Sequence, residues 1–387
     1  MTPPPLAPLE VPGRLGRLRA RLATAGADGQ PLDGLLVTTP ANIRWLTGFS
    51  GSAGLLLVTP ERALLTTDGR YRTQSSEQLH DSGVGGRVEV CIGGVAVQRE
   101  ALAALSGGAS TLGLEADHVT WSGQRSWDEL FAHSSLTPTR GIVEGLRLVK
   151  DDGEVDRMAR AAGIADEALA SVLPLLAAAG SSSSGTGGRP ELTESHFAAA
   201  LDHAMRELGA EDSAFETIVA SGENSAKPHA RPGGRVIGRG DPVVVDFGAV
   251  FDGYRSDMTR TFWVGGQPVG ELAAVFDVVA ESQRTGVAHV EPGVTAGSVD
   301  EACRQVIAAA GWAERFEHGT GHGVGLDIHE GPAVGPGSTA ILVRGTVVTV
   351  EPGVYLPDTG GVRIEDTLVV TGHGSRSLTR FPKEVAV

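Results

Sequence analysis

A hairpin in the second half of the chain places the strongest constraint on what it can fold into. Residues 243–264 read VVVDFGAVFDGYRSDMTRTFWV, two apolar runs joined at Asp252-Gly253. An Asp-Gly pair between apolar runs indicates a two-residue hairpin turn, because both turn positions need a positive φ. Such a turn pairs residue 251 with 254 and residue 246 with 259. The chain is therefore expected to build a sheet around these two strands.

Each strand of this hairpin carries an aspartate. In the expected register, Asp257 lies two residues from the partner of Asp246, so both carboxylates project from the same face and are diagonal neighbours. Two ionised carboxylates this close repel each other, and an unpaired buried charge is very costly. A salt bridge or a turn role would explain either aspartate alone. A bound cation explains both.

Two further strand-like runs, 342–355 and 361–371, repeat the feature. Glu351 ends the apolar run VVTVEPGVY, although a residue before Pro-Gly can also simply terminate a strand. Glu365 lies in GGVRIEDTLVV, with Arg363 two residues earlier on the same face. Four inward carboxylates and a histidine suit two divalent ions bridged by shared carboxylates. Because no cysteine joins these donors, the set favours manganese, cobalt or zinc without choosing among them.

Three histidines, His318, His322 and His329, lie close together in residues 318–332, HGTGHGVGLDIHEGP. Its first four glycines, at 319, 321, 323 and 325, do not follow the dinucleotide pattern G-x-G-x-x-G, and no P-loop G-K-[S/T] is present. The zinc-protease pattern H-E-x-x-H also fails, since Glu330 is followed by Gly-Pro-Ala. The histidines must therefore find their partners elsewhere in the chain. Asp327, Glu330 and Asp252 are expected to be turn or surface residues.

The remaining sequence predicts two domains. Residues 1–140 indicate a small α/β domain, with helices over 14–25, 97–106 and 122–132 and strands over 34–38, 54–59 and 63–67. Residues 135–148 have the composition of a connector, and 141–150 are taken as the linker. The second domain, 151–387, alternates helices with paired strands twice over. This pattern predicts an α+β fold of two similar halves, with helices on one side of the sheet.

Several helix boundaries follow from capping signals. A long helix is expected to start at Asp151 or Asp152, and others over 193–208, 270–289 and 298–310. The last would open with a capping box, Ser298-x-x-Glu301. Between the first two, residues 179–190 read AGSSSSGTGGRP, which predicts a mobile surface loop.

Composition excludes several classes of partner. The net charge is −15, which argues against binding to nucleic acid or to anionic membranes. Cys91 and Cys303, the two cysteines, do not suggest a disulfide framework. No signal peptide is recognisable, and no uninterrupted apolar stretch reaches the roughly 18–20 residues of a membrane span. A cytoplasmic protein is expected.

The motifs VVVDFGAVFDGYRSDMTRTF, GTGHGVGLDIHEGP, TVEPGVY and GVRIEDTLVV together closely resemble those of the pita-bread metallopeptidases, in particular their Xaa-Pro branch, aminopeptidase P and prolidase. The resemblance covers about residues 150–387. The stretches NIRWLTGFSGSAG and TTDGRYRTQ are more weakly similar to the creatinase-type N-terminal α/β domain of that branch. The resemblance implies a creatinase-like N-terminal domain followed along the chain by a pita-bread catalytic domain.

The resemblance also implies a ligand set for two divalent ions, with manganese as the first expectation and cobalt or zinc as alternatives. Asp246 would bind one ion, and Asp257 would bridge both. His322 and Glu351 would hold the second ion, and Glu365 would be the other bridge. Glu351 is also the candidate for carrying the proton of the attacking water.

The remaining roles concern the substrate. His229, in SGENSAKPHA, matches a catalytic histidine that contacts the region of the scissile carbonyl. His329, also taken as catalytic, and Arg363 match residues that bind substrate and stabilise the intermediate. His318 is expected to support the site rather than bind metal. Ala230 departs from the aromatic residue that many relatives have after this histidine.

The implied function is hydrolysis of the Xaa-Pro bond, in dipeptides or at the N-terminus of longer peptides. Proline favours a dedicated enzyme, because its nitrogen has no N–H and its φ is fixed. The alternatives are a non-catalytic binding protein of this fold and a creatinase-like amidinohydrolase. The resemblance further implies a homodimer. A dipeptidase needs a cation for the carboxylate after proline, and Arg44, Arg70 and Arg72 are the candidates.

Overall fold

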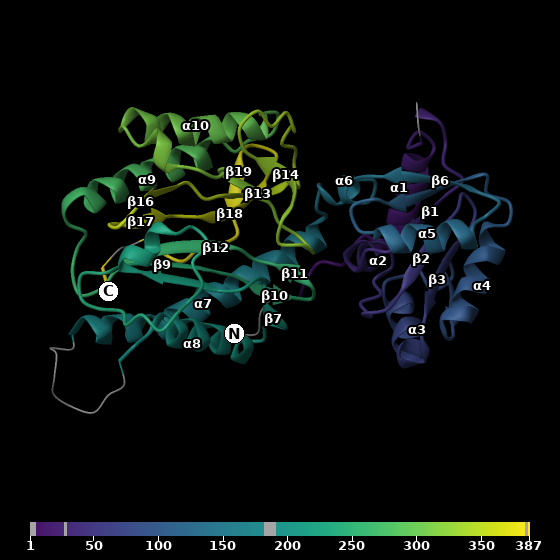
Figure 1. Cartoon of the computed structure of the whole chain (residues 1–387), viewed down its shortest axis with the longest axis horizontal. Coiled ribbons are helices and arrows are strands. Elements are labelled where there is room, and N and C mark those ends of the chain that lie inside the picture. Colours follow the sequence, from purple (N-terminus) through teal and green to yellow (C-terminus); the bar gives the residue numbers. More distant parts are fainter. Residues whose placement is uncertain (1–4, 27–28, 182–190, 384–385) are drawn as a thin grey trace. The chain divides into compact units, whose positions relative to one another are not determined.

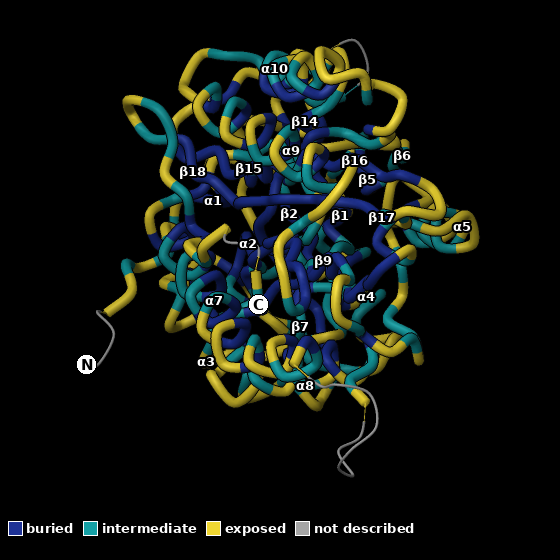
Figure 2. Tube along the Cα trace, turned by 90° about the vertical axis from the view of Figure 1, so that its left-hand side faces the viewer, coloured by how far each residue is buried: buried dark blue, intermediate teal, exposed yellow. Residues whose placement is uncertain are grey.

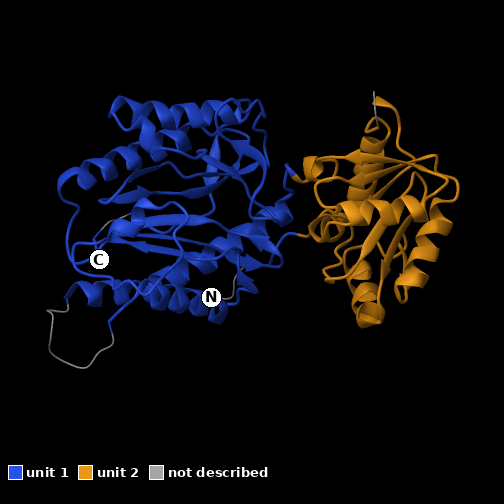
Figure 3. Ribbon diagram, in the orientation of Figure 1, with its two compact units in different colours: residues 1–7, 148–387 blue, residues 8–147 orange. Residues whose placement is uncertain are grey.

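The protein is described by a computed structural model over residues 5–26, 29–181, 191–383 and 386–387. These residues form two compact units (Figure 3). The N-terminal unit is Pro8–Arg147. The C-terminal unit is Leu148–Val387 together with the described residues up to Ala7.

The described residues of the N-terminal unit form a six-stranded sheet in the order β4-β3-β2-β1-β5-β6. The pairs β3–β4, β1–β5 and β5–β6 are parallel, and β1–β2 and β2–β3 are antiparallel. The strands are β1 Gly34–Val37, β2 Leu55–Val58, β3 Ala63–Thr67, β4 Glu89–Ile92, β5 Thr111–Glu115 and β6 Ser135–Thr139. The helices are α1 Val11–Leu22, α2 Pro40–Thr47, α3 Arg72–Asp81, α4 Val95–Ser106, α5 Trp121–Leu130, α6 Glu144–Arg147 and the 3-10 helix η2 Gly69–Tyr71.

This unit is more regular than its sequence indicates. Helices α1, α4 and α5 fall where helices were expected, whereas α2, α3 and β5 lie in stretches for which no element was predicted. The connector expected over 135–148 is wrong, because β6 pairs with β5 throughout Ser135–Thr139 and α6 follows. Pro138 is tolerated in β6 because that strand forms the edge of the sheet.

In the C-terminal unit, the larger sheets lie between two pairs of helices (Figure 1). Helices α7 and α8 pack together on one side, and α9 and α10 pack together on the other. This arrangement agrees with the expected doubling of helices and paired strands. The helices are α7 Asp152–Ser181, α8 Glu194–Glu207, α9 Gly270–His289 and α10 Ala296–Ala309, with the 3-10 helices η3 Gly222–Ala226 and η4 Ala313–Arg315.

The strands of the C-terminal unit, over its described residues, form four sheets. Two are larger, β12-β9-β8 and β14-β13-β15-β18-β19, and two are smaller, β11-β10-β7 and β16-β17. The strands are β7 Asp212–Ser213, β8 Ile218–Ser221, β9 Pro242–Phe247, β10 Ala249–Phe251, β11 Tyr254–Arg255, β12 Met258–Trp263, β13 Gly321–Gly323, β14 Glu330–Val334, β15 Val347–Val350, β16 Gly353–Leu356, β17 Gly360–Arg363, β18 Asp366–Val370 and β19 Ser375–Ser377.

The hairpin has the register expected from its turn. Phe251 pairs with Tyr254 across the turn, and Asp246 pairs with Thr259. Asp252 and Gly253 have φ values of 46° and 74°, as a two-residue turn of this type requires. Asp246 and Asp257 therefore leave the sheet on the same face.

The other two carboxylates lie at breaks between strands. The runs expected as continuous strands over 342–355 and 361–371 are each divided, so this part of the prediction is wrong. Glu351 separates β15 from β16, and Glu365 separates β17 from β18. Pro352 has no N–H to continue a ladder, which accounts for the first break. Both glutamates can thus turn away from the plane of their sheet.

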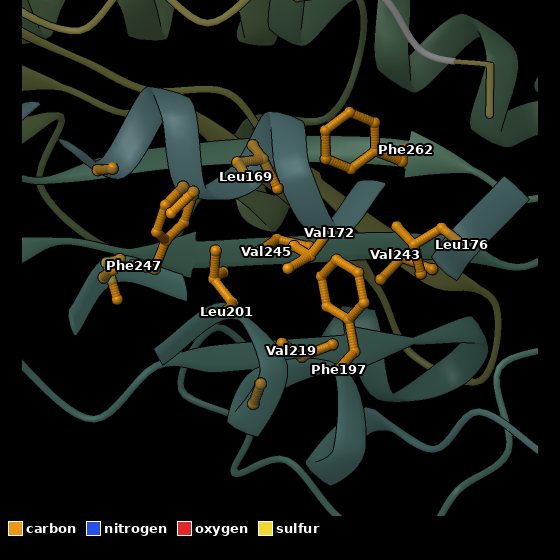
Figure 4. Close-up of a cluster of buried hydrophobic side chains, with 14 of the residues drawn as sticks. Leu169, Val172, Leu176, Phe197, Leu201, Val219, Val243, Val245, Phe247 and Phe262 are labelled. Atoms are coloured by element: carbon orange, nitrogen blue, oxygen red, sulfur yellow. The ribbon is translucent and has the colours of Figure 1, made fainter. Parts of the chain in front are cut away.

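The core beneath the hairpin consists of side chains from α7, α8, β8, β9 and β12 (Figure 4). Leu169, Phe197 and Val245 are fully buried in it. The central strands are buried along their length, while the outer faces of the helices are exposed (Figure 2). A second core lies between α9, α10 and the strands β15 to β18, and includes the free thiol of Cys303.

The capping predictions have mixed outcomes. Asp151 Oδ1 accepts a hydrogen bond from Glu154 N (2.9 Å) at the start of α7, as expected. Helix α10 begins earlier than predicted, and its cap is Thr295, whose Oγ1 accepts from Ser298 N (3.1 Å). The predicted capping box at Ser298 is therefore wrong.

Among the described residues, helix α7 is long and apolar enough to cross a membrane by length and composition alone, a test that the core helix of a protein outside a membrane also meets. The same helix supplies Ala165, Leu169, Val172 and Leu176 to the core, which accounts for its apolar character. Of the segment 179–190 expected to be a loop, residues 179–181 belong to α7, and 182–190 lie outside the described residues.

Candidate metal centre

The predicted site residues meet in one cavity of the C-terminal unit. Its volume is about 480 Å³. The lining includes the eight residues of the second domain to which the resemblance gave a metal, catalytic or substrate role: His229, Asp246, Asp257, His322, His329, Glu351, Arg363 and Glu365. Phe215, Ile218, Pro228 and Ile328 contribute an apolar part of the wall. The cavity therefore has a charged side and an apolar side.

Three carboxylates form the centre of the charged side. One oxygen from each of Asp246, Asp257 and Glu365 lies within 4.8 Å of the others. Thr259 Oγ1, from the residue that pairs with Asp246, donates to Glu365 Oε2 (2.7 Å). The hairpin thus fixes two of the carboxylates directly and orients the third through Thr259.

His322 and Glu351 adjoin this cluster. His322 Nε2 lies 3.6 Å from Asp257 Oδ2 and 3.5 Å from Glu351 Oε1. The other ring nitrogen, Nδ1, lies 3.0 Å from the carbonyl oxygen of Gly323, which accepts a hydrogen bond when Nδ1 is protonated. In that tautomer Nε2 presents its lone pair to the carboxylates, as in metal sites whose histidine is oriented by a backbone carbonyl.

The electrostatics of the cluster fit a cation. Burial, followed by the charges of Glu365, Asp246 and Glu351, raises the pKa of Asp257 well above its usual range. Burial, followed by Glu351 and Asp246, raises the pKa of Glu365 in the same way. Asp246 Oδ1 is buried and has no hydrogen-bond partner among the described residues. A divalent ion would neutralise the repulsion and satisfy this oxygen.

Glu351 and His322 have shifted pKa values as well. Burial raises the pKa of Glu351 to about 8, with Arg363 opposing the shift. Burial lowers the pKa of His322 to about 4, so its imidazole is neutral at pH 7 and available as a ligand. The five side chains together offer oxygen and nitrogen donors without sulfur, as divalent manganese, cobalt and zinc sites do. Their assignment as ligands stays a prediction.

Arg363 is bound on several sides by protein. It is 3% exposed, and it donates to Asp246 Oδ2 (2.7 Å), Thr259 Oγ1 (3.2 Å), Pro228 O (3.1 Å) and Tyr355 Oη (2.9 Å). These contacts make it an anchor for Asp246. The substrate contact expected of Arg363 remains a prediction.

Tyr355 is a residue that the sequence analysis did not single out. Its hydroxyl joins Arg363 to His318 Nε2, which lies 2.8 Å away. Burial lowers the pKa of His318 to about 4, and its Nδ1 lies 2.8 Å from Gly319 O. These contacts support the expectation that His318 braces the site instead of binding metal. The tyrosine lies four residues after Glu351 in the same motif, and only this proximity could have suggested it.

The other two histidines are exposed to the cavity. His229 follows η3, next to Ala230, and His329 lies just before β14. The rings of His329 and His322 are in edge contact, with centroids 4.3 Å apart. His329 is therefore placed beside an expected ligand, and His229 shares the cavity wall. Their contact with substrate stays a prediction.

Glu330 is not the surface residue that the sequence suggested. Its side chain is 7% exposed, and Oε1 lies 2.6 Å from Lys150 Nζ, which is itself 1% exposed.

The arginines that were candidates for binding the substrate carboxylate belong to the N-terminal unit. Arg70 pairs with Asp68 (2.8 Å) there, and Arg72 opens α3. Their proposed role is untested, as is that of Arg44 on α2.

The cavity, its acidic cluster and the helix-flanked sheets define a metal-dependent hydrolase of the pita-bread fold. The chain belongs to metallopeptidase family M24, which it matches over residues 156–372. Residues 14–149 match the creatinase/prolidase N-terminal domain. These matches confirm the expected fold and class, and membership of the family implies divalent metal ions and a peptide substrate.

Similar proteins cover almost the whole chain. An uncharacterized peptidase of Bacillus subtilis is 40% identical over 356 residues, 92% of this chain and 96% of that protein. The structure of an Xaa-Pro dipeptidase from Bacillus anthracis has a TM-score of 0.88 at 37% identity and covers 98% of this chain and 100% of that one. An X-Pro aminopeptidase from Thermotoga maritima has a TM-score of 0.81 at 32% identity, covering 92% and 98%.

Proposed function

We propose that the protein is a peptidase that hydrolyses the bond between an N-terminal residue and a following proline. The observation that most directly supports this proposal is the cluster of Asp246, Asp257 and Glu365, with His322 and Glu351 beside it. The cluster lies in a cavity large enough for a small peptide. The relatives named for this specificity include both an Xaa-Pro dipeptidase and an X-Pro aminopeptidase. We further propose that two ions bind, with manganese preferred.

The five donor side chains would hold the ions. When bound, divalent ions lower the pKa of water and polarise a peptide carbonyl. We assign to Glu351 the role of accepting the proton of the attacking water, because it is a carboxylate beside the cluster. The proline nitrogen leaves as a secondary amine and must gain a proton, which Glu351 can return.

The remaining residues bind and orient. His229 and His329 would donate hydrogen bonds to the carbonyl oxygen as it gains negative charge. Arg363 holds Asp246 Oδ2, whereas the buried Oδ1 has no hydrogen-bond partner among the described residues and would be available to a metal ion. The acidic lining favours a substrate with a free, positively charged α-amino group. The apolar wall formed by Phe215 and Ile218 is suited to the first residue or to proline.

Peptide length is the open part of this proposal. Arg231 and Glu216 both line the cavity, and their side chains form an exposed ion pair (3.3 Å, 83% and 64% exposed). An exposed pair of this kind contributes little to stability and can open to admit a longer chain. We retain both dipeptidase and aminopeptidase P activity as candidates. A homodimer and a cytoplasmic location are also proposed, from the resemblance and from the composition.

The test is a peptide series assayed with the purified protein after chelation and reloading with manganese, cobalt or zinc. Xaa-Pro, Xaa-Pro-Yaa and matched Xaa-Ala peptides are compared by detection of the released first residue. The proposal expects turnover of proline peptides only, and loss of turnover after chelation. Equal cleavage of the Xaa-Ala series would refute the specificity. Absence of all cleavage in the loaded protein would favour the non-catalytic alternative.

A further inference from the structure

Lys150 and Glu330 form a buried ion pair that the proposed mechanism does not use. Lys150 lies in the short segment before α7, and Glu330 is the first residue of β14, 180 positions later in the chain. Their charged atoms are 2.6 Å apart, at angles outside those of a hydrogen bond, and both side chains are almost fully buried. Because the pair is expensive to bury, its retention calls for an explanation other than stability.

The pair sits at the base of the segment that carries His329. Gly325 packs so closely on the Glu330 carboxylate that a Cβ at this position would collide with it. The same segment is held from the hairpin side, where Arg255 N donates to Gly325 O (2.9 Å) and Arg255 Nε to Leu326 O (3.2 Å). The backbone from 325 to 330 is thus folded around one carboxylate, and Lys150 fixes that carboxylate.

Glu330 pairs with Gly323 in the β13–β14 ladder, and its carboxylate lies against Lys150. His329, in the bend just before that strand, lines the cavity, whereas Glu330 is not part of the cavity lining. The His329 ring is exposed in the cavity, where its edge contacts the His322 ring. Its position is consequently set by the backbone that Glu330 anchors.

Lys150 is itself well fixed. Its N–H donates to Gly345 O (2.9 Å), and the adjacent Val149 forms a bridge with Thr346. The residues 345–346 lead directly into β15, whose end carries Glu351. The ion pair therefore ties the His329 segment to the same framework that supports an expected metal ligand.

We propose that Lys150 and Glu330 are positioning residues, whose ion pair holds His329 beside the carboxylate cluster. The proposal rests on the proposed peptidase function for its kinetic consequence. Its structural consequence, the location of the His329 ring, can be tested whether or not the protein is a peptidase.

The test uses the full-length Lys150→Met/Glu330→Met double variant, which removes both charges and keeps the side-chain volume. The control is Arg157→Met/Asp252→Asn, which removes an ion pair (2.6 Å) between helix α7, the helix that follows Lys150, and the hairpin turn. Measured for both are kcat and KM on an Xaa-Pro peptide, manganese binding by calorimetry, the melting temperature and the crystal structure.

We expect kcat of the double variant to fall by about 10²-fold, the loss typical of a displacement of about 1 Å. Manganese stoichiometry should be unchanged, and the crystal structure should show the His329 ring displaced from its 4.3 Å contact with His322. The control should keep wild-type kcat. Wild-type kcat in the double variant, or an unmoved His329 ring, would overturn the proposal, as would an equal loss in the control.

Glu330→Asp provides a second test if the double variant fails to fold. It keeps the charge but shortens the side chain by one methylene, so the pair can re-form only by drawing the backbone toward Lys150. We expect a lower kcat with manganese binding retained, and a wild-type kcat would contradict the proposal. If the wild-type protein cleaves no Xaa-Pro peptide, the proposed function fails, while the ring position in the variants still decides the role of the pair.

Discussion

Replacement of Asp257 by asparagine should have opposite effects on the metal-free and the metal-loaded protein. Asp257 is 5% exposed and lies within 4.8 Å of Asp246 and Glu365. Asparagine has the same shape, carries no charge, and its amide can donate to the neighbouring carboxylates. In the metal-free protein the substitution therefore removes repulsion and adds hydrogen-bond donors.

The size of the effect follows from the spacing. Two ionised carboxylates whose oxygens lie no more than 4.8 Å apart repel by at least about 3.5 kcal/mol at an effective dielectric constant of about 20. The wild-type cluster avoids part of this cost by retaining protons, because its pKa values are raised. We therefore expect the metal-free Asp257→Asn variant to be more stable than the wild type by about 1–3 kcal/mol at pH 8. Each kcal/mol should raise the melting temperature by about 2–4 °C.

The sign of the pH dependence is determined by the raised pKa. Between about pH 4, where an unfolded aspartate ionises, and the higher pKa of folded Asp257, the folded state binds more protons. Wild-type stability thus falls as pH rises through this window. The advantage of the variant should be small near pH 4.5 and largest at pH 8. Groups distant from the cluster contribute equally in both proteins, so the difference reports Asp257 together with its electrostatic coupling to Glu365, Asp246 and Glu351.

The assay is thermal unfolding in chelator and in excess manganese at both pH values, with peptide turnover measured on the same samples. In manganese the order of stability should reverse, because the variant has lost a bridging ligand and its metal affinity should fall by more than the roughly 10–100-fold typical of an outer-shell partner. Turnover should be lost. A metal-free variant less stable than wild type at pH 8 would refute the electrostatic reasoning, and unchanged turnover would reject the bridging role.

Three further predictions concern protons, a buried ion pair and the core. Because burial raises the pKa of metal-free Glu351 to about 8, manganese binding at pH 7 should release at least one proton, and the affinity for manganese should rise with pH up to about 8. Calorimetry in two buffers of different ionisation enthalpy measures the proton release. Binding heats that do not depend on the buffer would contradict the prediction. His322, with a pKa of about 4, should add nothing in this range. Asp366→Asn leaves the buried Arg260 without its carboxylate partner at 2.9 Å and should cost about 3–5 kcal/mol in urea unfolding, whereas a loss below about 1 kcal/mol would show that backbone carbonyls suffice. Leu201→Ala, in the core shown in Figure 4, should cost about 2–5 kcal/mol by the same measurement while turnover of the folded fraction stays at the wild-type value.

The sequence predicts the hairpin site well because its information is local. Strand alternation and the Asp252-Gly253 turn determine the register, and the register determines that Asp246 and Asp257 share a face. The same reasoning does not reach Glu351 and Glu365. Their strands break at the glutamates, and the direction of Glu365 depends on a contact with Thr259, which is 106 residues away.

The missed helices of the N-terminal unit have a different cause. Helix α2 has Pro40 in its first turn and Gly48 at its C-terminal end with φ of 80°, which are recognisable start and stop signals. Its eight residues are too few to display a clear amphipathic period. Short helices of this kind are stabilised by packing on the sheet, which no local pattern records.

Charged residues were the hardest to assign. Glu330 looks like a turn residue because it precedes Gly-Pro, and Lys150 looks like the end of a linker. Their burial results from the meeting of two distant segments, and neither flank indicates it. The environment of a charged side chain could be predicted where strand alternation indicates the face to which the side chain points. It could not be predicted where two distant segments bury the side chain between them.

The register of the hairpin also limits how this part of the chain can change in length. The turn at Asp252-Gly253 has two residues, and every pair from 251 with 254 to 242 with 263 follows from that number. Insertion or deletion of a single residue between 247 and 257 would send Asp257 to the opposite face of its strand. Homologues that keep the metal centre should therefore vary in residue identity within this segment while conserving its length, and engineered insertions belong elsewhere in the chain.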